Sequence, residues 1–352
     1  MAGNLPSKKK SIYPVSRALQ DYLQKYGRVS ELPLQYNDMV RYISAIPVRN
    51  SKGKDTLWET VFYEQAEAIE INKACCMIYA FLKTDGDLKV IEHLEVDRID
   101  FCTFGNTNPF RVRIINRMND NYDHFYIKRI DASRIYGLEL EYLLSPNIIS
   151  YLIDEGTIIE EHVAGIPGDD FMKNNLDVSV FEKTRIAKEF IKFNERCFVR
   201  LLGDMRSYNF VIDITPDIEG NQYRIIAIDF DQQCYEGRKN FYLPQFFKDN
   251  NEIIKLGMEH LNFESVRQYQ LEERSLIARR AKSEIDRLND LLTCMVKDEL
   301  STPDKIEQLK IELGQHHKTA LFENCKSMGD IVYTNIKLLL QKEFKESFIK
   351  TD

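Results

Sequence analysis

Two stretches decide the fold: residues 201–213, LLGDMRSYNFVID, and residues 224–233, RIIAIDFDQQ. Asp204 and Asn209 are five residues apart, and an apolar, strand-like run follows Asn209. Asp229 comes directly after the apolar run at 225–228, at the end of a second predicted strand. Adjacent strands joined by the polar hairpin at 216–221 would gather these side chains as oxygen ligands for a hard, octahedral cation.

Such a constellation suits phosphoryl transfer, in which one carboxylate orients the acceptor hydroxyl while an amide and a second carboxylate hold magnesium. The segment GDMRSYN resembles the catalytic loop of the protein-kinase-like superfamily, and IDFD resembles its metal-binding motif. The version is similar to that of aminoglycoside and choline phosphotransferases, where an Asp-Phe-acidic sequence often replaces Asp-Phe-Gly. The resemblance implies that Asp204 acts at the acceptor and that Asn209 and Asp229 bind metal. Arg206 occupies the place of a phosphate-contacting lysine; a surface arginine is the open alternative.

Two upstream segments extend the resemblance. YIKRI resembles the third strand of the superfamily, with Lys128 in the position that contacts the nucleotide phosphates. The helical segment IYGLELEYLL would carry the glutamate that pairs with this lysine. Glu139 is the first choice for that partner and Glu141 is the second.

Two further segments resemble the nucleotide-covering turn and the hinge, and they complete the succession of motifs that the superfamily shows along its chain. FGNTNPF carries Gly105 where the superfamily has a glycine-rich turn, although this sequence has no G-x-G-x-x-G. IIEEHVAGIPGDDF resembles the hinge of small-molecule kinases. Backbone groups near Glu161, His162 and Val163 would then meet the base.

The resemblance implies a two-lobed, protein-kinase-like fold. The pattern of apolar and turn residues around the motifs predicts an α+β protein with helical additions at both ends. Residues 12–85 read mainly as helix, interrupted by a polar loop at 50–54, and the chain beyond residue 237 reads as nearly all helix. The expected elements between are three antiparallel strands within 88–130, a helix at 131–144, strands near 148–153 and 157–163, a helix at 178–202, and strands at 210–214 and 223–230. The predicted domains are a helical extension (1–87), an N-lobe (88–163), a C-lobe core (164–262) and a helical C-terminal region (263–352).

Composition narrows the class of protein. Among 352 residues, 48 Lys and Arg stand against 55 Asp and Glu, a net charge of −7, which argues against a general nucleic-acid or anionic-membrane binder. The run Lys8–Lys10 is expected to be solvated. No apolar run reaches the roughly 18 residues of a membrane span, and the first residues do not form a secretory signal. Seven cysteines without a CxxC pair indicate reduced thiols and a cytoplasmic protein.

The resemblance implies ATP and Mg²⁺ as cofactors and in-line transfer of the γ-phosphoryl group to a hydroxyl of a small molecule or a protein. Two alternatives keep the same fold. One is a catalytically weak pseudokinase that acts as a nucleotide-binding regulatory or interaction module. The other is a nucleotidyl transferase. The sequence does not indicate the acceptor or the oligomeric state.

Overall fold

The computed structural model describes residues 10–50, 52–84 and 86–341. The chain divides into two compact units. Unit 1 comprises Met1–Val15, Leu23–Asp131 and Ile149–His162, and unit 2 comprises Ser16–Tyr22, Ala132–Ile148 and Val163–Asp352. None of the described helices is both long enough and apolar enough to span a membrane.

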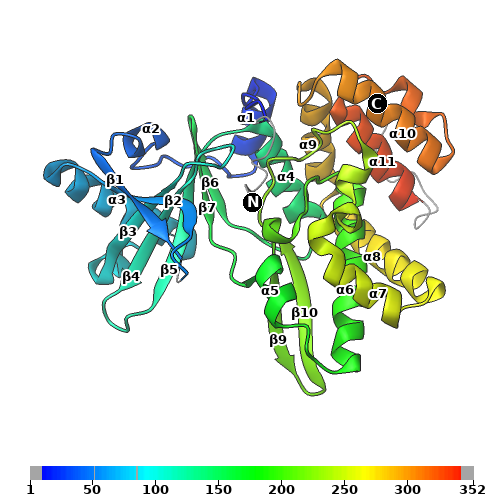
Figure 1. The fold of residues 1–352 in the computed structure, drawn as a ribbon. Coiled ribbons are helices and arrows are strands. Elements are labelled where there is room, and N and C mark those ends of the chain that lie inside the picture. The colour runs from blue at the N-terminus through cyan, green and yellow to red at the C-terminus, as the bar shows by residue number, and fades with distance from the viewer. Residues whose placement is uncertain (1–9, 51, 85, 342–352) are drawn as a thin grey trace. The chain divides into compact units, whose positions relative to one another are not determined.

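Unit 1 is built on a seven-stranded antiparallel sheet with the order β1-β2-β3-β4-β5-β7-β6 (Figure 1). Helix α3 packs against β3 and β4. Apolar side chains that alternate along β4 and β5, such as Val112, Ile114, Phe125 and Ile127, are buried in the core. The elements are α2 (Tyr36–Met39), β1 (Ser44–Arg49), β2 (Asp55–Phe62), α3 (Gln65–Lys83), η1 (Leu88–His93), β3 (Leu94–Cys102), β4 (Phe110–Asn116), β5 (Tyr122–Arg129), β6 (Tyr151–Asp154) and β7 (Thr157–Glu161).

The expectation that residues 12–85 are mainly helical is wrong for the hairpin β1–β2. Strand β2 contains Trp58, Thr60 and Val61, residue types that favour strands, and it pairs with β3 through Trp58 and Cys102. After the predicted loop at 50–54, helix begins only at Gln65, where α3 starts. Pairing with a distant strand therefore outweighs the local pattern.

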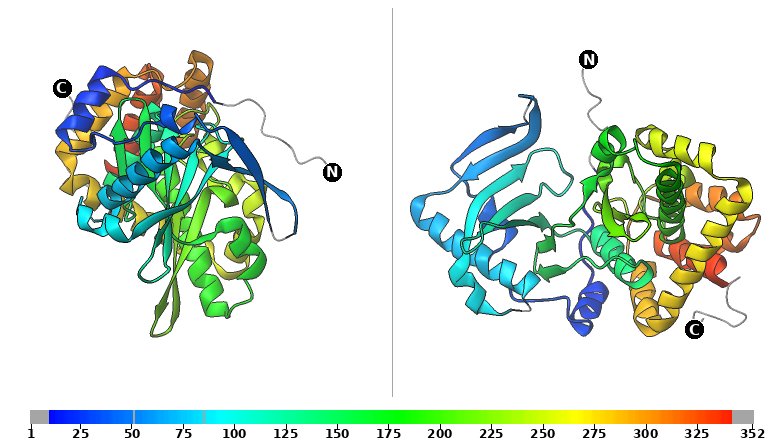
Figure 2. Two further views of the ribbon diagram at one scale, coloured as in Figure 1. Left: turned by 90° about the vertical axis from the view of Figure 1, so that its left-hand side faces the viewer. Right: turned by 90° about the horizontal axis from the view of Figure 1, so that it is seen from below.

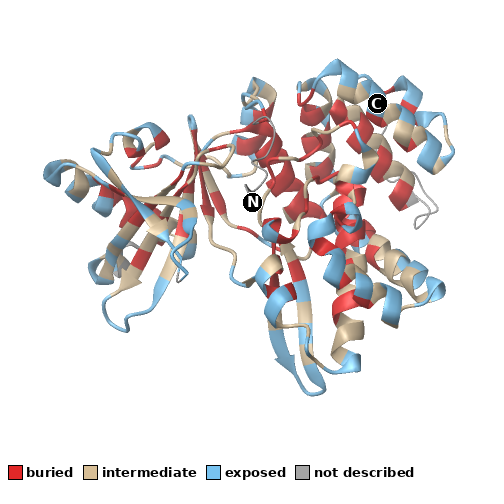
Figure 3. Cartoon of the chain, viewed as in Figure 1, coloured by how far each residue is buried: buried red, intermediate tan, exposed pale blue. Residues whose placement is uncertain are grey.

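Unit 2 combines a three-stranded antiparallel sheet, order β10-β9-β8, with most of the helices. The hairpin β9–β10 lies beside α6, and its tip is exposed (Figures 2 and 3). The elements are α4 (Ala132–Leu144), β8 (Ile166–Pro167), α5 (Gly168–Asn174), α6 (Val180–Arg200), η2 (Ser207–Asn209), β9 (Phe210–Asp217), β10 (Gly220–Ala227), η3 (Lys239–Tyr242), η4 (Pro244–Phe246), η5 (Lys248–Asn250), α7 (Asn251–His260), α8 (Phe263–Ser283), α9 (Ile285–Lys297), α10 (Pro303–His317), η6 (Leu321–Asn324) and α11 (Met328–Gln341). Helix α1 (Arg17–Lys25) contributes residues to both units.

The basic run near the start does not behave as predicted, at least at Lys10. Its ammonium donates to the carboxylate of Asp131 at 2.6 Å, and both side chains are buried. Asp131 also accepts from the backbone N–H of Tyr13, so its carboxylate anchors the N-terminal segment. A buried ammonium is tolerated here because a carboxylate compensates it. Lys8 and Lys9 lie outside the described residues.

The predicted fold class is confirmed: an α+β protein with a two-lobed, kinase-like division of its elements. One unit is an antiparallel sheet with Lys128 on β5, and the other is largely helical with Asp204 and Asp229 flanking a small antiparallel hairpin. The helices after residue 262 belong to the body of unit 2.

Candidate functional site

The loop that carries Asp204 begins where α6 ends. Leu201 adopts a left-handed conformation (φ 54°), and its N–H bonds to carbonyls of the last helical turn. Asp204 is also left-handed (φ 58°), which is unusual for a residue with a side chain. The loop holds this conformation because the Asp204 N–H donates to the Phe241 carbonyl at 3.1 Å and the Arg206 N–H donates to the Asp204 carbonyl at 2.8 Å. A strained backbone held by its surroundings is typical of functional loops.

The carboxylate of Asp204 is held by Arg206. The Arg206 Nε donates to Asp204 Oδ1 at 2.9 Å, and its Nη1 donates to Asp249 at 3.1 Å. Burial raises the pKa of the Asp204 carboxyl to about 6, although Arg206 acts in the opposite direction. A carboxylate whose pKa lies near neutral pH is suited to accept a proton from a hydroxyl. Arg206 therefore contacts the candidate catalytic group directly.

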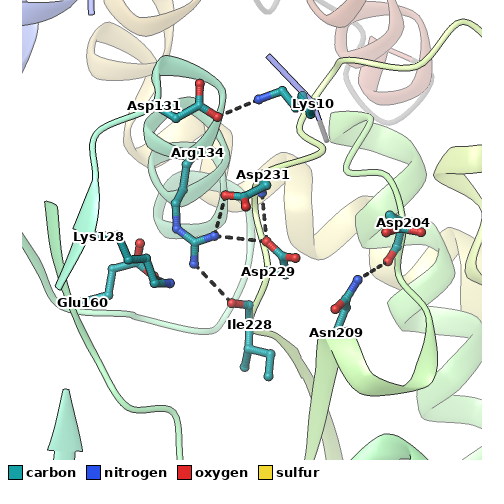
Figure 4. Close-up of polar contacts among 10 residues, drawn as sticks. All are labelled: Lys10, Lys128, Asp131, Arg134, Glu160, Asp204, Asn209, Ile228, Asp229 and Asp231. Atoms are coloured by element: carbon teal, nitrogen blue, oxygen red, sulfur yellow. Dashed lines mark hydrogen bonds and ion pairs between the residues drawn. The ribbon is translucent and has the colours of Figure 1, made fainter. Parts of the chain in front are cut away.

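Strand pairing brings Asn209 and Asp229 together. The ladder between β9 and β10 ends at Phe210 and Ala227, and the Ile228 N–H continues it by donating to the Asn209 carbonyl at 3.0 Å. The Asn209 side-chain NH₂ donates to the Asp204 carbonyl at 2.7 Å, as Figure 4 shows. This bond turns the amide oxygen of Asn209 away from the loop carbonyl. The three residues that the sequence singled out thus lie within one small part of unit 2.

Asp229 belongs to an ion cluster that the sequence did not predict, together with the buried side chains of Arg134 and Asp231. Arg134 of α4 donates through Nη1 to Asp229 Oδ1 at 3.0 Å and to Asp231 Oδ1 at 2.7 Å. The Asp231 N–H also donates to Asp229 Oδ1, at 3.1 Å. Asp231 stands where the Asp-Phe-Gly motif has its glycine, and its side chain is buried against Arg134 instead of solvated. The sequence of α4 gives little signal for this cluster, because Arg134 shares the helix with two other charged residues, Glu139 and Glu141.

The donor set fits a magnesium ion with few protein ligands. Asn209 offers an amide oxygen, and Asp229 offers a carboxylate that is 35% exposed. Among the described residues no group of three or more His, Cys, Asp or Glu side chains could hold a metal ion. Magnesium commonly binds through one or two carboxylates and completes its shell with water and substrate phosphates. The residues present satisfy that requirement.

In unit 1, Lys128 has a carboxylate partner on the neighbouring strand. Its ammonium donates to Glu160 at 2.8 Å, and both side chains are buried. Glu160 pairs with Tyr126 across the ladder between β5 and β7, so it lies on the same face of the sheet as Lys128. The resemblance implied a helix glutamate as the carboxylate partner of Lys128, and it gave no indication of Glu160.

The two helix glutamates bond to other groups within unit 2. Glu139 accepts from the Tyr22 hydroxyl and from Arg287, whose Nη2 is 2.7 Å away. Glu141 forms a buried ion pair with Arg200 and accepts from Asn147 at 3.0 Å. These contacts join α4 to neighbouring elements of unit 2. A role for either glutamate at Lys128 stays a prediction.

Gly105 lies in the turn between β3 and β4, as predicted. A Cβ at this position would come within 2.8 Å of the Pro109 side chain, so the turn needs a residue without one. The turn closes through bonds from the Cys102 N–H to the Pro109 carbonyl and from the Asn108 N–H to the Gly105 carbonyl. Gly105 therefore has a packing role whether or not the turn covers a nucleotide.

Two backbone N–H groups of the predicted hinge already donate hydrogen bonds within unit 1. The Glu161 N–H donates to the Ser150 carbonyl, and the His162 N–H donates to the His124 carbonyl. The His162 ring lies 3.2 Å from the Tyr126 hydroxyl, and burial lowers its pKa. Val163 is the first residue of this segment in unit 2. Recognition of a base would therefore use backbone groups other than these two N–H groups.

Comparison with known proteins gives little further information. No family model matches the chain, and no curated protein matches it. A solved structure of the Rad53 kinase domain and SCD2 in complex with AMPPNP is 14% identical, covers 47% of this chain and 78% of its own, and has a TM-score of 0.24. A second structure of the Rad53 kinase domain and SCD2 is 16% identical, covers 48% and 76%, and has a TM-score of 0.23. Likeness of this size does not establish a function.

Proposed function

We propose that this protein is an ATP- and Mg²⁺-dependent phosphotransferase that moves the γ-phosphoryl group to a hydroxyl of a small molecule or a protein. The observation that carries the proposal is the pairing of β9 and β10, which brings Asn209 and Asp229 together beside the loop of Asp204. Phosphoryl transfer depends on positioning and charge stabilisation, and these three groups are the ones it requires.

Each residue has a proposed part in the reaction. Asp204 accepts the hydroxyl proton of the acceptor at its carboxylate, and Arg206 holds that carboxylate in place. Asn209 and Asp229 would bind magnesium, which would neutralise charge on the phosphates. Lys128 is proposed to contact those phosphates. The acceptor is either a small molecule or a protein, and no nucleic-acid or membrane partner is proposed.

One observation favours the alternative of a catalytically weak nucleotide-binding module. Arg134 donates to Asp229, the proposed metal ligand, and so lowers the negative charge there. Such a protein would bind nucleotide without transferring its phosphoryl group. The retention of Asp204 with a pKa near 6 supports the enzyme instead, because a binding module does not need a base.

Nucleotide binding gives the first prediction. We expect ATP with Mg²⁺ to raise the thermal midpoint by several degrees, because a ligand at 100 times its Kd stabilises a folded protein by about 2.7 kcal/mol. Asp229→Asn should remove most of this shift, since magnesium prefers charged oxygen ligands. The measurement is a thermal melt with ATP, Mg²⁺, both, or neither.

Asp213→Asn is the matched control, because Asp213 lies on β9 opposite Arg224 of β10, and its side chain forms no hydrogen bond or ion pair with another described residue. It should respond to ATP with Mg²⁺ as the unmodified protein does. A protein whose midpoint does not move at millimolar ATP and Mg²⁺ would contradict the proposed function.

A further inference from the structure

Arg134 is a buried cation at the proposed metal site. Its side chain is 2% exposed, and it lies between two carboxylates that are two residues apart in the chain, Asp229 and Asp231. Figure 4 shows the guanidinium directed at both carboxylates. A single nitrogen, Nη1, serves both, at 3.0 Å and 2.7 Å. This is the position in which a cation bridges two carboxylates.

The backbone around the cluster is packed tightly, so the guanidinium has a defined place. A Cβ on Gly137 of α4 would lie 2.8 Å from the Phe230 Cβ, which shows how closely α4 approaches the turn between the two aspartates. Arg134 also reaches the Ile228 carbonyl at 3.4 Å. The Asp231 N–H holds Asp229 Oδ1 from another direction. Helix and turn thus fix the arginine against both carboxylates.

We propose that Arg134 is a built-in substitute for one divalent cation, so that this site takes up a single metal ion and does so together with nucleotide. The proposal rests on the proposed function, in which Asp229 is a metal ligand. A divalent ion bridging Asp229 and Asp231 would have to displace Arg134. Displacement would leave a buried guanidinium without these carboxylates, which is strongly unfavourable. Asp229 and Asn209 would then hold the metal that accompanies the nucleotide, while Arg134 keeps its place between the two carboxylates.

Charge accounting leads to an observable consequence. The Arg134 guanidinium contributes one positive charge that both carboxylates contact. Arg134→Met removes that charge and keeps an unbranched, apolar side chain in its place, so the carboxylates repel each other and attract a divalent cation. Arg134→Met should therefore acquire a metal site that does not need nucleotide. Arg134→Lys keeps the charge and should not acquire it.

The test counts bound Mn²⁺ by electron paramagnetic resonance and measures thermal midpoints, each with and without AMP-PNP. The unmodified protein and Arg134→Lys should bind one Mn²⁺ per chain, only with AMP-PNP. Arg134→Met should melt about 5 to 10 °C lower without metal, bind one Mn²⁺ without AMP-PNP, and recover most of the lost midpoint. Arg134→Met combined with Asp231→Asn removes one carboxylate as well, so its midpoint should not respond to Mn²⁺ alone.

Three results would overturn the proposal. One is two Mn²⁺ ions bound to the unmodified protein with AMP-PNP. Another is an Arg134→Met protein whose thermal midpoint does not change when Mn²⁺ is added. The same conclusion follows if Arg134→Met fails to fold both with and without Mn²⁺ while the double variant folds. The third is an unmodified protein that binds neither AMP-PNP nor Mn²⁺, which would remove the proposed function too and is recognised without any variant.

Discussion

Asp204→Asn is expected to lower phosphoryl transfer by about a hundredfold or more while leaving nucleotide affinity nearly unchanged. Asparagine keeps the size of the side chain and an oxygen that can accept from Arg206, but it cannot take the proton of an attacking hydroxyl. The measurement is turnover of ATP together with the Kd for ATP and Mg²⁺. Asp213→Asn serves again as the control with full activity, and full turnover in Asp204→Asn would remove the catalytic-loop assignment.

The same variant should be more stable at neutral pH. Burial raises the folded-state pKa of Asp204 from 3.8 to about 6, so between these values the folded protein binds more protons than the unfolded chain. Its contribution to stability is therefore greatest near pH 4 and is lost as pH rises to about 6. Asp204→Asn has no carboxyl group to ionise, so its stability does not fall in this way. Its free energy of unfolding should exceed that of the unmodified protein by about 1 to 3 kcal/mol at pH 7, and the difference should shrink toward pH 4. Activity of the unmodified protein should fall as pH drops below about 6.

Ending the chain after residue 262 is expected to abolish cooperative folding. The C-terminal helices supply partners for charges buried elsewhere in unit 2: Glu273 of α8 binds Arg196 at 3.1 Å, and Arg287 of α9 binds Glu139 at 2.7 Å. Breaking one buried pair costs about 3 to 5 kcal/mol, a large part of a typical folding free energy of about 5 to 15 kcal/mol. Solubility, oligomeric state and a denaturant melt measure the result.

Two point variants test whether packing of the C-terminal helices, and not the removal of residues as such, stabilises the fold. Leu291 of α9 is fully buried, and Leu271 of α8 is 42% exposed. Leu291→Ala should cost about 2 to 5 kcal/mol, and Leu271→Ala should change stability by less than about 0.5 kcal/mol. A truncated chain that stays soluble, monomeric and cooperatively folded would show that the helices are a dispensable addition.

The parts of the fold that the sequence predicted depend on local pattern. Helix α4, helix α6 and the hairpin β9–β10 carry clear periodicity and turn residues, and the order of Asp204, Asn209 and Asp229 follows from that hairpin. The parts that it missed depend on long-range pairing. Strand β2 is a strand because β3 lies beside it, and Lys10 is buried because Asp131, 121 residues away, compensates its charge.

The candidate site shows the same limit. A sequence motif identifies its own residues, but it does not identify the side chains that bond to them in the folded protein. Arg134 lies 95 residues before Asp229, and Glu160 lies 32 residues after Lys128. Their spacing in the chain carries no signal, because the strand and helix packing that brings each pair together is not local. The structure therefore adds the surrounding charges to a core of residues that the sequence had already identified.

Transfer of label from ATP tests the central claim most directly. The protein is incubated with γ-labelled or α-labelled ATP, with and without Mg²⁺, and label is followed in the protein, in candidate acceptors and in released phosphate. The account predicts transfer from the γ position only, dependent on Mg²⁺ and lost in Asp204→Asn. Transfer from the α position would contradict it in favour of nucleotidyl transfer, and no transfer from either position, despite nucleotide binding, would contradict it in favour of a binding module.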